Sequence, residues 1–192
     1  MRIVAGRHRG RNIAAPPGNA LRPTADRVRE SVFNILVHGG GRLGGEDVVT
    51  GAEVLDAFAG TGAMGLEAVS RGAAHATCMD SDLTALDACR ANVRALGEAA
   101  QVTVLGGDCL DPVRAARPCS LVFLDPPYRS GIAAPALEAL ARAGWIAPGA
   151  ICVVELAAKE PFAPPPDAEL LDERRYGAAR VVLLRWNAPA DR

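Results

Sequence analysis

The sequence predicts an α/β protein built around a doubly wound, mostly parallel β-sheet that ends in an antiparallel hairpin. From residue 53 onward, short apolar segments alternate with segments of helical periodicity. The apolar segments do not alternate polar and apolar residues, which is typical of strands covered on both faces. Two further strand-like segments flank Tyr176-Gly177 near the end of the chain. Together these patterns predict a Rossmann-like fold, in which ligands bind beyond the carboxyl ends of the strands.

The individual elements can be assigned in chain order. We expect parallel strands at 54–57, 76–79, 102–105, 121–124 and 151–156. We expect helices at about 63–71, 83–96 and 134–143, because apolar residues recur there at helical spacing. A proline-rich connection at 161–166 precedes the closing hairpin, whose strands are expected at 169–174 and 181–186. We assign residues 46–192 to this domain.

The first 45 residues are expected to form a basic N-terminal extension, with a short strand pair at 2–5 and 12–14. A helix should begin near Pro23-Thr24, with Thr24 as its N-cap. Residues 1–30 carry a local charge of +5, although the whole chain has a net charge of -1. A basic segment on a nearly neutral chain indicates a polyanionic partner for that segment, whereas a solvated arm is the alternative. Its arginines are Arg2, Arg7, Arg9, Arg11, Arg22, Arg27 and Arg29.

Composition argues against several other classes of protein. The five cysteines include no C-x-x-C pair, so we expect neither a zinc site nor a redox motif. Their odd number fits a reducing compartment better than a disulfide framework. The sequence contains no long apolar run, and its N-terminus lacks the apolar core of a signal peptide. We therefore expect a cytoplasmic protein, acting as a monomer, with no membrane partner and no metal.

A glycine-bearing turn after the strand at 54–57 predicts a site for an adenosine-containing cofactor. Gly60 and Gly62 would let the backbone approach a ligand closely. Because Gly60-x-Gly62-x-x-Gly65 also matches the dinucleotide fingerprint, the glycines alone do not distinguish NAD from S-adenosylmethionine. Asp56 favours S-adenosylmethionine, since an acid there would repel a pyrophosphate but can pair with a cationic amino group. A tight turn without a ligand is the alternative. The binding run comprises Asp56, Phe58, Ala59, Gly60, Thr61 and Gly62.

Acids also follow the next two strands. Asp80, with Ser81 after it, comes twenty positions after Gly60 and can accept hydrogen bonds from both hydroxyls of a ribose. Asp108, with Cys109 after it, can accept a hydrogen bond from the N6 amino group of an adenine. Asp108 can equally cap a helix, and the two roles can coexist. These four residues complete the predicted cofactor site.

The strand at 121–124 runs directly into Asp125-Pro126-Pro127-Tyr128. An aromatic amino group is a poor nucleophile because its lone pair is delocalised into the ring. Hydrogen bonds from its two N–H groups to the Asp125 carboxylate and to a proline carbonyl would draw the nitrogen toward tetrahedral geometry. The prolines would hold these acceptors in place, and Tyr128 would stack on the base. The four residues therefore predict methyl transfer to an exocyclic amino group of a nucleic-acid base; the alternative is a Pro-Pro turn with an incidental acid.

The whole chain resembles the bacterial ribosomal RNA small-subunit methyltransferase D family. The resemblance covers the two motifs above and two more specific N-terminal blocks, which run through Met1-Arg2-Ile3-Val4-Ala5-Gly6 with Arg9-Gly10-Arg11, and through Leu21-Arg22-Pro23-Thr24 with Asp26-Arg27-Val28-Arg29-Glu30 to Phe33-Asn34. One departure is Asp80, where relatives carry glutamate. The chain has the shorter side chain of the two acids there.

The resemblance implies a class I S-adenosylmethionine-dependent fold and methylation of the N2 amino group of a guanine in 16S rRNA, either free or in an assembling small ribosomal subunit. It also implies that the N-terminal segment holds the rRNA. The residues expected to contact RNA are Arg2, Arg7, Arg9, Arg11, Arg22, Thr24, Arg27, Arg29 and Arg129.

The sequence leaves three other functions open. A DNA adenine or cytosine amino-methyltransferase would share the chemistry, but this chain has no spare segment for reading DNA sequence. An NAD-dependent oxidoreductase would share the glycine turn, but none of the three histidines follows a predicted strand. A non-catalytic RNA-binding module would have no use for Asp125 and Tyr128.

Overall fold

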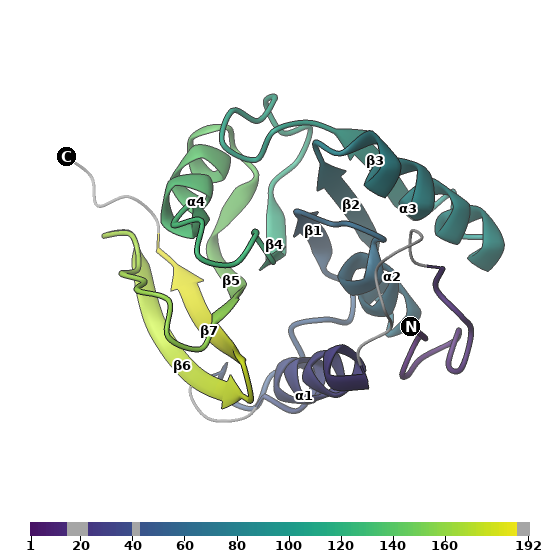
Figure 1. Cartoon of the computed structure of the whole chain (residues 1–192), viewed down its shortest axis with the longest axis horizontal. Helices are drawn as coiled ribbons and strands as arrows, with labels where there is room; N and C mark the ends of the chain where they lie inside the picture. Colours follow the sequence, from purple (N-terminus) through teal and green to yellow (C-terminus); the bar gives the residue numbers. More distant parts are fainter. Residues whose placement is uncertain (15–22, 40–42, 188–192) are drawn as a thin grey trace.

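The computed structural model describes residues 1–14, 23–39 and 43–187, and these are arranged around one seven-stranded sheet (Figure 1). The strand order is β3-β2-β1-β4-β5-β7-β6, and the first five of these strands are parallel. β7 runs antiparallel to both β5 and β6. The strands are β1 (Glu53–Ala57), β2 (His75–Asp80), β3 (Val102–Gly106), β4 (Cys119–Leu124), β5 (Ile146–Ala157), β6 (Ala168–Tyr176) and β7 (Ala179–Trp186). The predicted doubly wound sheet with a closing hairpin is confirmed.

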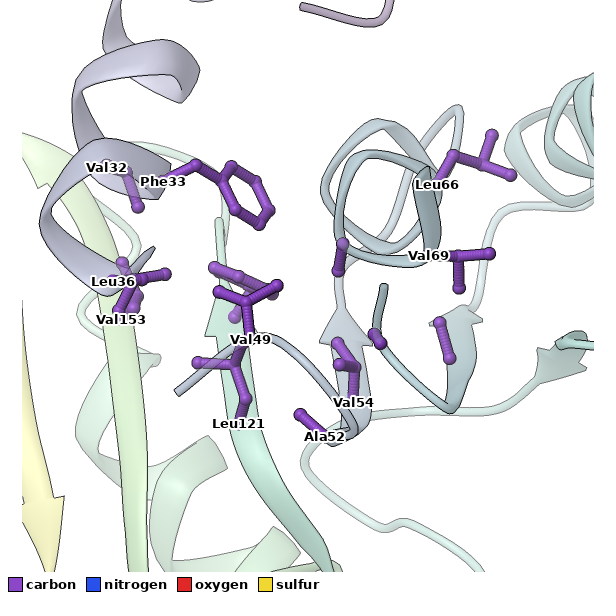
Figure 2. Packing of buried hydrophobic residues seen from close by; sticks show 14 of the residues in the cluster. Val32, Phe33, Leu36, Val49, Ala52, Val54, Leu66, Val69, Leu121 and Val153 are labelled. Carbon is purple, nitrogen blue, oxygen red and sulfur yellow. The ribbon is translucent and has the colours of Figure 1, made fainter. Parts of the chain in front are cut away.

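Helices cover both faces of this sheet. The helices are α1 (Pro23–His38), α2 (Ala63–Ser70), α3 (Leu83–Leu96) and α4 (Ala133–Arg142). Apolar residues of α1, α2 and α3 share one buried cluster with one face of the strands, whereas α4 packs in a second cluster on the other face. In Figure 2, Leu36 of α1 lies beside Val153 of β5, and Val49 lies between Phe33 of α1 and Leu121 of β4. The sheet therefore forms the middle layer of three.

β5 is longer than the sequence predicts, because it begins at Ile146 rather than near residue 151. Its pairing with β4 shifts in register between Cys119 and Leu121. Pro148 and Gly149 lie within this added part of the strand. Because proline and glycine are uncommon in strands, strand propensity does not predict this part.

Residues 1–14, called the N-terminal arm below, fold back on themselves beside α2 and α3 (Figure 1). The predicted strand pair is reduced to a single antiparallel bridge between Arg2 and Asn12. Ile3 and Ile13 are buried in the same cluster as α1, α2 and α3. The arm and α1 thus share one core with residues 46–192. The division of the chain by role near residue 45 stays a prediction.

α1 adds an aromatic contact to that shared core. The Phe33 ring lies 5.4 Å from the Phe123 ring of β4, centroid to centroid, and is fully buried. The guanidinium carbon of Arg71 lies 4.9 Å from the centroid of the Phe33 ring on the α2 side. None of the helices among the described residues is long and apolar enough to cross a membrane.

Candidate active site

The cleft of the molecule lies at the carboxyl ends of β1, β4 and β5. It consists of two adjoining cavities, an inner one of about 440 Å³ and an outer one of about 910 Å³. Asp56, Phe58, Gly60 and α1 line the inner cavity. Tyr128 and Asp80 line the outer one. Residues that line both are Val28, Phe58, Asp82, Asp125 and Glu155.

The glycine turn after β1 has the backbone that the sequence predicts, but the glycines are needed for different reasons. Gly60 and Gly62 have φ of 54° and 77°, a region that residues with a side chain rarely adopt. A Cβ on Gly60 would point into open space, so Gly60 leaves room beside the turn. A Cβ on Gly62 would instead lie 2.5 Å from the Cys89 sulfur, so packing against α3 excludes a side chain there. Phe58, with φ of 58°, adds backbone strain, which is typical of functional sites.

Asp56 is a buried acid at the inner end of the cleft. Its Oδ2 accepts a hydrogen bond of 2.8 Å from the Gly65 N–H. Burial raises the pKa of Asp56 to about 7, against the lowering effect of the Gly65 N–H, and the nearby charge of Asp80 raises it further. None of the salt bridges between described residues involves this carboxylate. Such a buried acid suits a cationic ligand group.

Asp80 and Asp108 line the outer cavity, and Ser81 lies beside Asp80 there. Asp80 Oδ2 accepts a hydrogen bond of 2.8 Å from the Gly60 N–H, and its Oδ1 accepts one of 2.9 Å from the Asp82 N–H. The acid therefore also fixes the glycine turn against β2. Asp108 Oδ1 accepts a hydrogen bond of 2.8 Å from the Leu110 N–H and closes a local turn. Cys109 is buried, and burial raises the pKa of its thiol to about 12.

The Asp125-Pro126-Pro127-Tyr128 segment forms the rim between the two cavities. Water reaches the Asp125 side chain from the cleft, but protein walls surround it. This partial desolvation, together with the charges of Glu155 and Asp56, raises the pKa of Asp125 to about 8. The Pro127 carbonyl accepts a hydrogen bond from the Ser130 N–H at 3.3 Å. Tyr128 is 43% exposed, and its hydroxyl donates to Glu155 Oε1 at 2.7 Å.

Two glutamates that the sequence reading missed support this rim. Glu155 lies on β5 beside the end of β4, and the pairing of Leu124 with Val154 brings it next to Asp125. Glu160 is buried and accepts hydrogen bonds from the Arg129 N–H at 2.7 Å and the Ala157 N–H at 3.3 Å. It thereby holds Arg129 at a φ of 59° directly after Tyr128. The residues around Glu155 in the sequence do not predict a role at the cleft, because only the register between β4 and β5 brings it there.

A third missed residue joins the glycine turn to the N-terminal arm. Asn92 of α3 is buried, and its side-chain N–H groups donate to the carbonyls of Thr61 and Ala14 at 3.0 Å each. Its Oδ1 accepts the Ala14 N–H at 2.9 Å. The arm is therefore tied to the turn through one amide side chain.

The predicted RNA-contacting residues whose side chains the structure describes fall into two groups, those on the surface and those that are engaged within the protein. Arg2, Arg9 and Arg27 are exposed and line a third cavity of about 470 Å³ on the arm and α1. Arg129 is exposed beside Tyr128, and Arg11 is exposed while its Nη2 donates to the Ala95 carbonyl at 2.7 Å. Arg22 and the side chain of Thr24 lie outside the described residues.

Arg29 and Arg7 are engaged within the protein. Arg29 is 4% exposed, and its Nη2 donates to the Arg2 carbonyl and to Asp26 Oδ1. Its predicted RNA contact is therefore corrected, because the buried guanidinium does not reach the surface. The half-exposed Arg7 forms two hydrogen bonds of 2.7 Å with the Glu98 carboxylate.

The described residues contain no group of three or more His, Cys, Asp or Glu side chains arranged to hold a metal ion. The five cysteines, all buried, form no disulfide.

Comparison with known proteins relates this architecture to a family. The sequence profile of the family described as conserved hypothetical protein 95 matches residues 1–185. Ribosomal RNA small subunit methyltransferase D of Escherichia coli K12 is 37% identical over 156 residues, which cover 81% of this chain and 74% of the relative. The protein of the same name from Haemophilus influenzae is 33% identical over 189 residues, which cover 96% and 93%.

Comparison with solved structures gives the same relationship. The Escherichia coli protein yhhF has a TM-score of 0.81 at 34% identity and covers 98% of this chain and 99% of its own. TrmN from Thermus thermophilus, at 22% identity and a TM-score of 0.66, covers 87% of this chain and 51% of its own, and shows the Rossmann-like class I methyltransferase fold alone. On the strength of the matched profile and the full-length relatives, the chain belongs to the ribosomal RNA small-subunit methyltransferase D family.

Proposed function

We propose that this protein transfers a methyl group from S-adenosylmethionine to the N2 amino group of a guanine in 16S rRNA of the small ribosomal subunit. The observation that carries the proposal is that Asp125 and Tyr128 line the same cleft as Asp56 and Gly60. The group that would hold the cofactor and the group that would hold the substrate amino nitrogen thus line adjoining cavities. We infer the rRNA substrate from the names of the relatives.

The residues of the cleft suit S-adenosylmethionine, which when bound supplies a methyl group on a positively charged sulfur. Asp56 is a buried carboxylate without a salt bridge among the described residues, and it would hold the cationic amino group of the methionine part. The open space beside Gly60 would admit the cofactor next to the turn. Asp80 would accept the ribose hydroxyls, and Asp108 the adenine amino group.

The rim would hold the substrate amino group. One amino N–H would donate to Asp125, and the other to the Pro126 carbonyl, since the Pro127 carbonyl already accepts the Ser130 N–H. Tyr128 would lie against the base while its hydroxyl stays on Glu155. Such alignment of reacting atoms can contribute about 7–11 kcal/mol to catalysis.

Asp125 would also take up the proton that the nitrogen loses when it is methylated. Its raised pKa, caused by partial desolvation and by the charges of Glu155 and Asp56, makes it a stronger base than an ordinary aspartate. The positive charge of a bound cofactor would favour its ionised form before transfer.

The basic surface would orient the RNA rather than select the base. Arg2, Arg9 and Arg27 line one cavity, and Arg129 stands beside Tyr128, so phosphate contacts could be made on both sides of the cleft. An rRNA substrate also implies a cytoplasmic protein.

The direct test is transfer of tritiated methyl groups to small-subunit rRNA from a strain that lacks this protein. We expect one labelled position, recovered after digestion as N2-methylguanosine. Label in N6-methyladenosine, in a 2′-O-methylated nucleoside or only in DNA would contradict the proposal. Wild-type rRNA, already methylated, provides the control and should accept little label.

A further inference from the structure

Glu155 occupies a position that the methyl-transfer chemistry does not require. It lies on β5, one strand away from Asp125, and lines both the inner and the outer cavity. Its Oε1 accepts the Tyr128 hydroxyl at 2.7 Å. A carboxylate offers roughly four acceptor positions, so one hydroxyl fixes its orientation without exhausting its capacity. An oriented acceptor therefore stands beside the group that grips the substrate amino nitrogen.

The hydrogen-bonding patterns of the bases indicate what this acceptor could recognise. In guanine, the amino group lies between two ring nitrogens: N3 is an acceptor, whereas N1, on the Watson–Crick edge, carries a hydrogen and is a donor. In adenine and cytosine, the ring nitrogen next to the amino group is an acceptor. An ionised carboxylate can only accept hydrogen bonds. It would pair with the guanine N1–H and face the lone pair of the corresponding nitrogen in the other two bases.

We propose that Glu155 is a specificity-determining residue that selects guanine by accepting its N1–H while Asp125 accepts an N2–H. This inference rests on the proposed function and extends it to the choice of base. Enzymes that act on extruded bases read them by hydrogen bonds to the Watson–Crick edge, and Asp125 and Glu155 would together cover two of its donors. Tyr128 would be a positioning residue for Glu155 as well as the stacking ring.

The test uses a synthetic RNA fragment that contains the mapped target, in which guanine is replaced by 2-aminopurine. This base keeps the amino group but has no hydrogen on N1. We expect the unaltered enzyme to lose about 100-fold in kcat/KM, since a site built for a donor rejects an analogue that lacks it. This measurement needs no variant, so it holds even if a substitution harms folding.

The matched variant is Glu155→Gln, which keeps the shape of the side chain and an oxygen for the Tyr128 hydroxyl, but adds an N–H donor. We expect its preference for guanine over 2-aminopurine to fall to within about fivefold, because the amide can pair with either form of N1. Glu138→Gln on α4, an exposed acid on the opposite layer, serves as control and should keep the full preference.

The outcomes separate this inference from the proposed function. If the unaltered enzyme methylates guanine N2 but accepts 2-aminopurine equally well, Glu155 does not read N1 and the inference is overturned. The same holds if Glu155→Gln keeps the full preference, because the loss would then come from the missing O6 of the analogue. Methylation of a base other than guanine would overturn the proposed function itself.

Discussion

The acids that hold the N-terminal arm and the acids of the cleft differ in their partners. The acids of the arm pair with cationic side chains, whereas those of the cleft, among the described residues, do not. Glu67, fully buried on α2, accepts the Val4 and Ala5 N–H groups at 2.8 and 3.0 Å and pairs with Arg71 at 2.7 Å. Glu98 contacts Arg7 and His8. Although burial alone would raise the pKa of Glu98, the hydrogen bonds from these two residues lower it.

The cleft acids have neutral partners instead. Asp56 is held by a backbone N–H and Glu155 by a phenol, and no salt bridge between described residues reaches Asp56, Asp125 or Glu155. Burial raises the pKa of Asp56, and partial desolvation raises that of Asp125. The comparison indicates that the acids paired with cations in the arm stabilise the fold, and we infer that the cleft acids, which have no such partner among the described residues, are available to ligands.

The largest expected effect on stability comes from Glu67→Ala. Removing this carboxylate leaves the buried Arg29 and the largely buried Arg71 without their shared partner and frees two N–H groups of the arm. We expect the free energy of unfolding to fall by about 3–5 kcal/mol, measured by urea denaturation.

The cleft provides the contrasting variant. Asp125→Asn should leave the free energy of unfolding unchanged or slightly higher at neutral pH, because the acid has no stabilising cation among the described residues. Glu169→Ala, an exposed acid on β6, controls for loss of a surface charge. Equal destabilisation by Glu67→Ala and Asp125→Asn would break the comparison.

An intermediate effect is expected on the basic surface. Replacing Arg2, Arg9 and Arg27 together by alanine should weaken RNA binding about 10- to 100-fold and reduce the slope of affinity against salt by about 2. The physical reason is the loss of phosphate contacts, and filter binding across a salt series measures both quantities.

A matched triple variant, with alanine for the exposed Arg94, Arg114 and Arg142 outside that cavity, removes the same charge. It should change RNA affinity much less. If both triple variants weaken binding equally, net charge rather than the arm surface attracts the RNA.

The smallest expected effect concerns pH. Because burial raises the pKa of Asp56 to about 7, the acid is increasingly neutral below that value and attracts a cationic amino group less. Affinity for S-adenosylmethionine should therefore fall up to about 10-fold between pH 8 and pH 6, as followed by calorimetry. The nearby charge of Asp80 raises this pKa and that of Arg29 lowers it, and the value of about 7 reflects both effects. Asp56→Asn should bind weakly with a flat pH profile; a wild-type slope in this variant would assign the titration to another group.

The sequence predicted the parts of the molecule that depend on neighbouring residues. The strands, the glycine turn and the Asp125–Tyr128 rim are local patterns, and α2 to α4 were expected within about two residues of their observed ends. The start of β5 was missed because its first residues pair through an irregular register with β4.

Contacts between distant residues could not be predicted in the same way. Glu155 reaches the rim only through the register of β4 and β5, and Glu67 meets Val4 across 63 positions of sequence. An RNA contact was predicted for Arg29 because it belongs to the basic N-terminal segment, yet its guanidinium donates to the Arg2 carbonyl of the arm and is buried. Long-range packing, which overrides local pattern, explains each of these misses.

The most direct test of the whole account is Asp125→Ala, measured for methyl transfer and for S-adenosylmethionine affinity in the same preparation. We expect transfer to fall by about 1,000-fold or more, because the amino group loses both its orientation and its base, while cofactor affinity stays nearly unchanged. Asp87→Ala, an exposed acid on α3, should leave both quantities intact. If Asp125→Ala instead loses cofactor affinity in proportion to activity, the carboxylate serves the cofactor, and the account of the rim is contradicted.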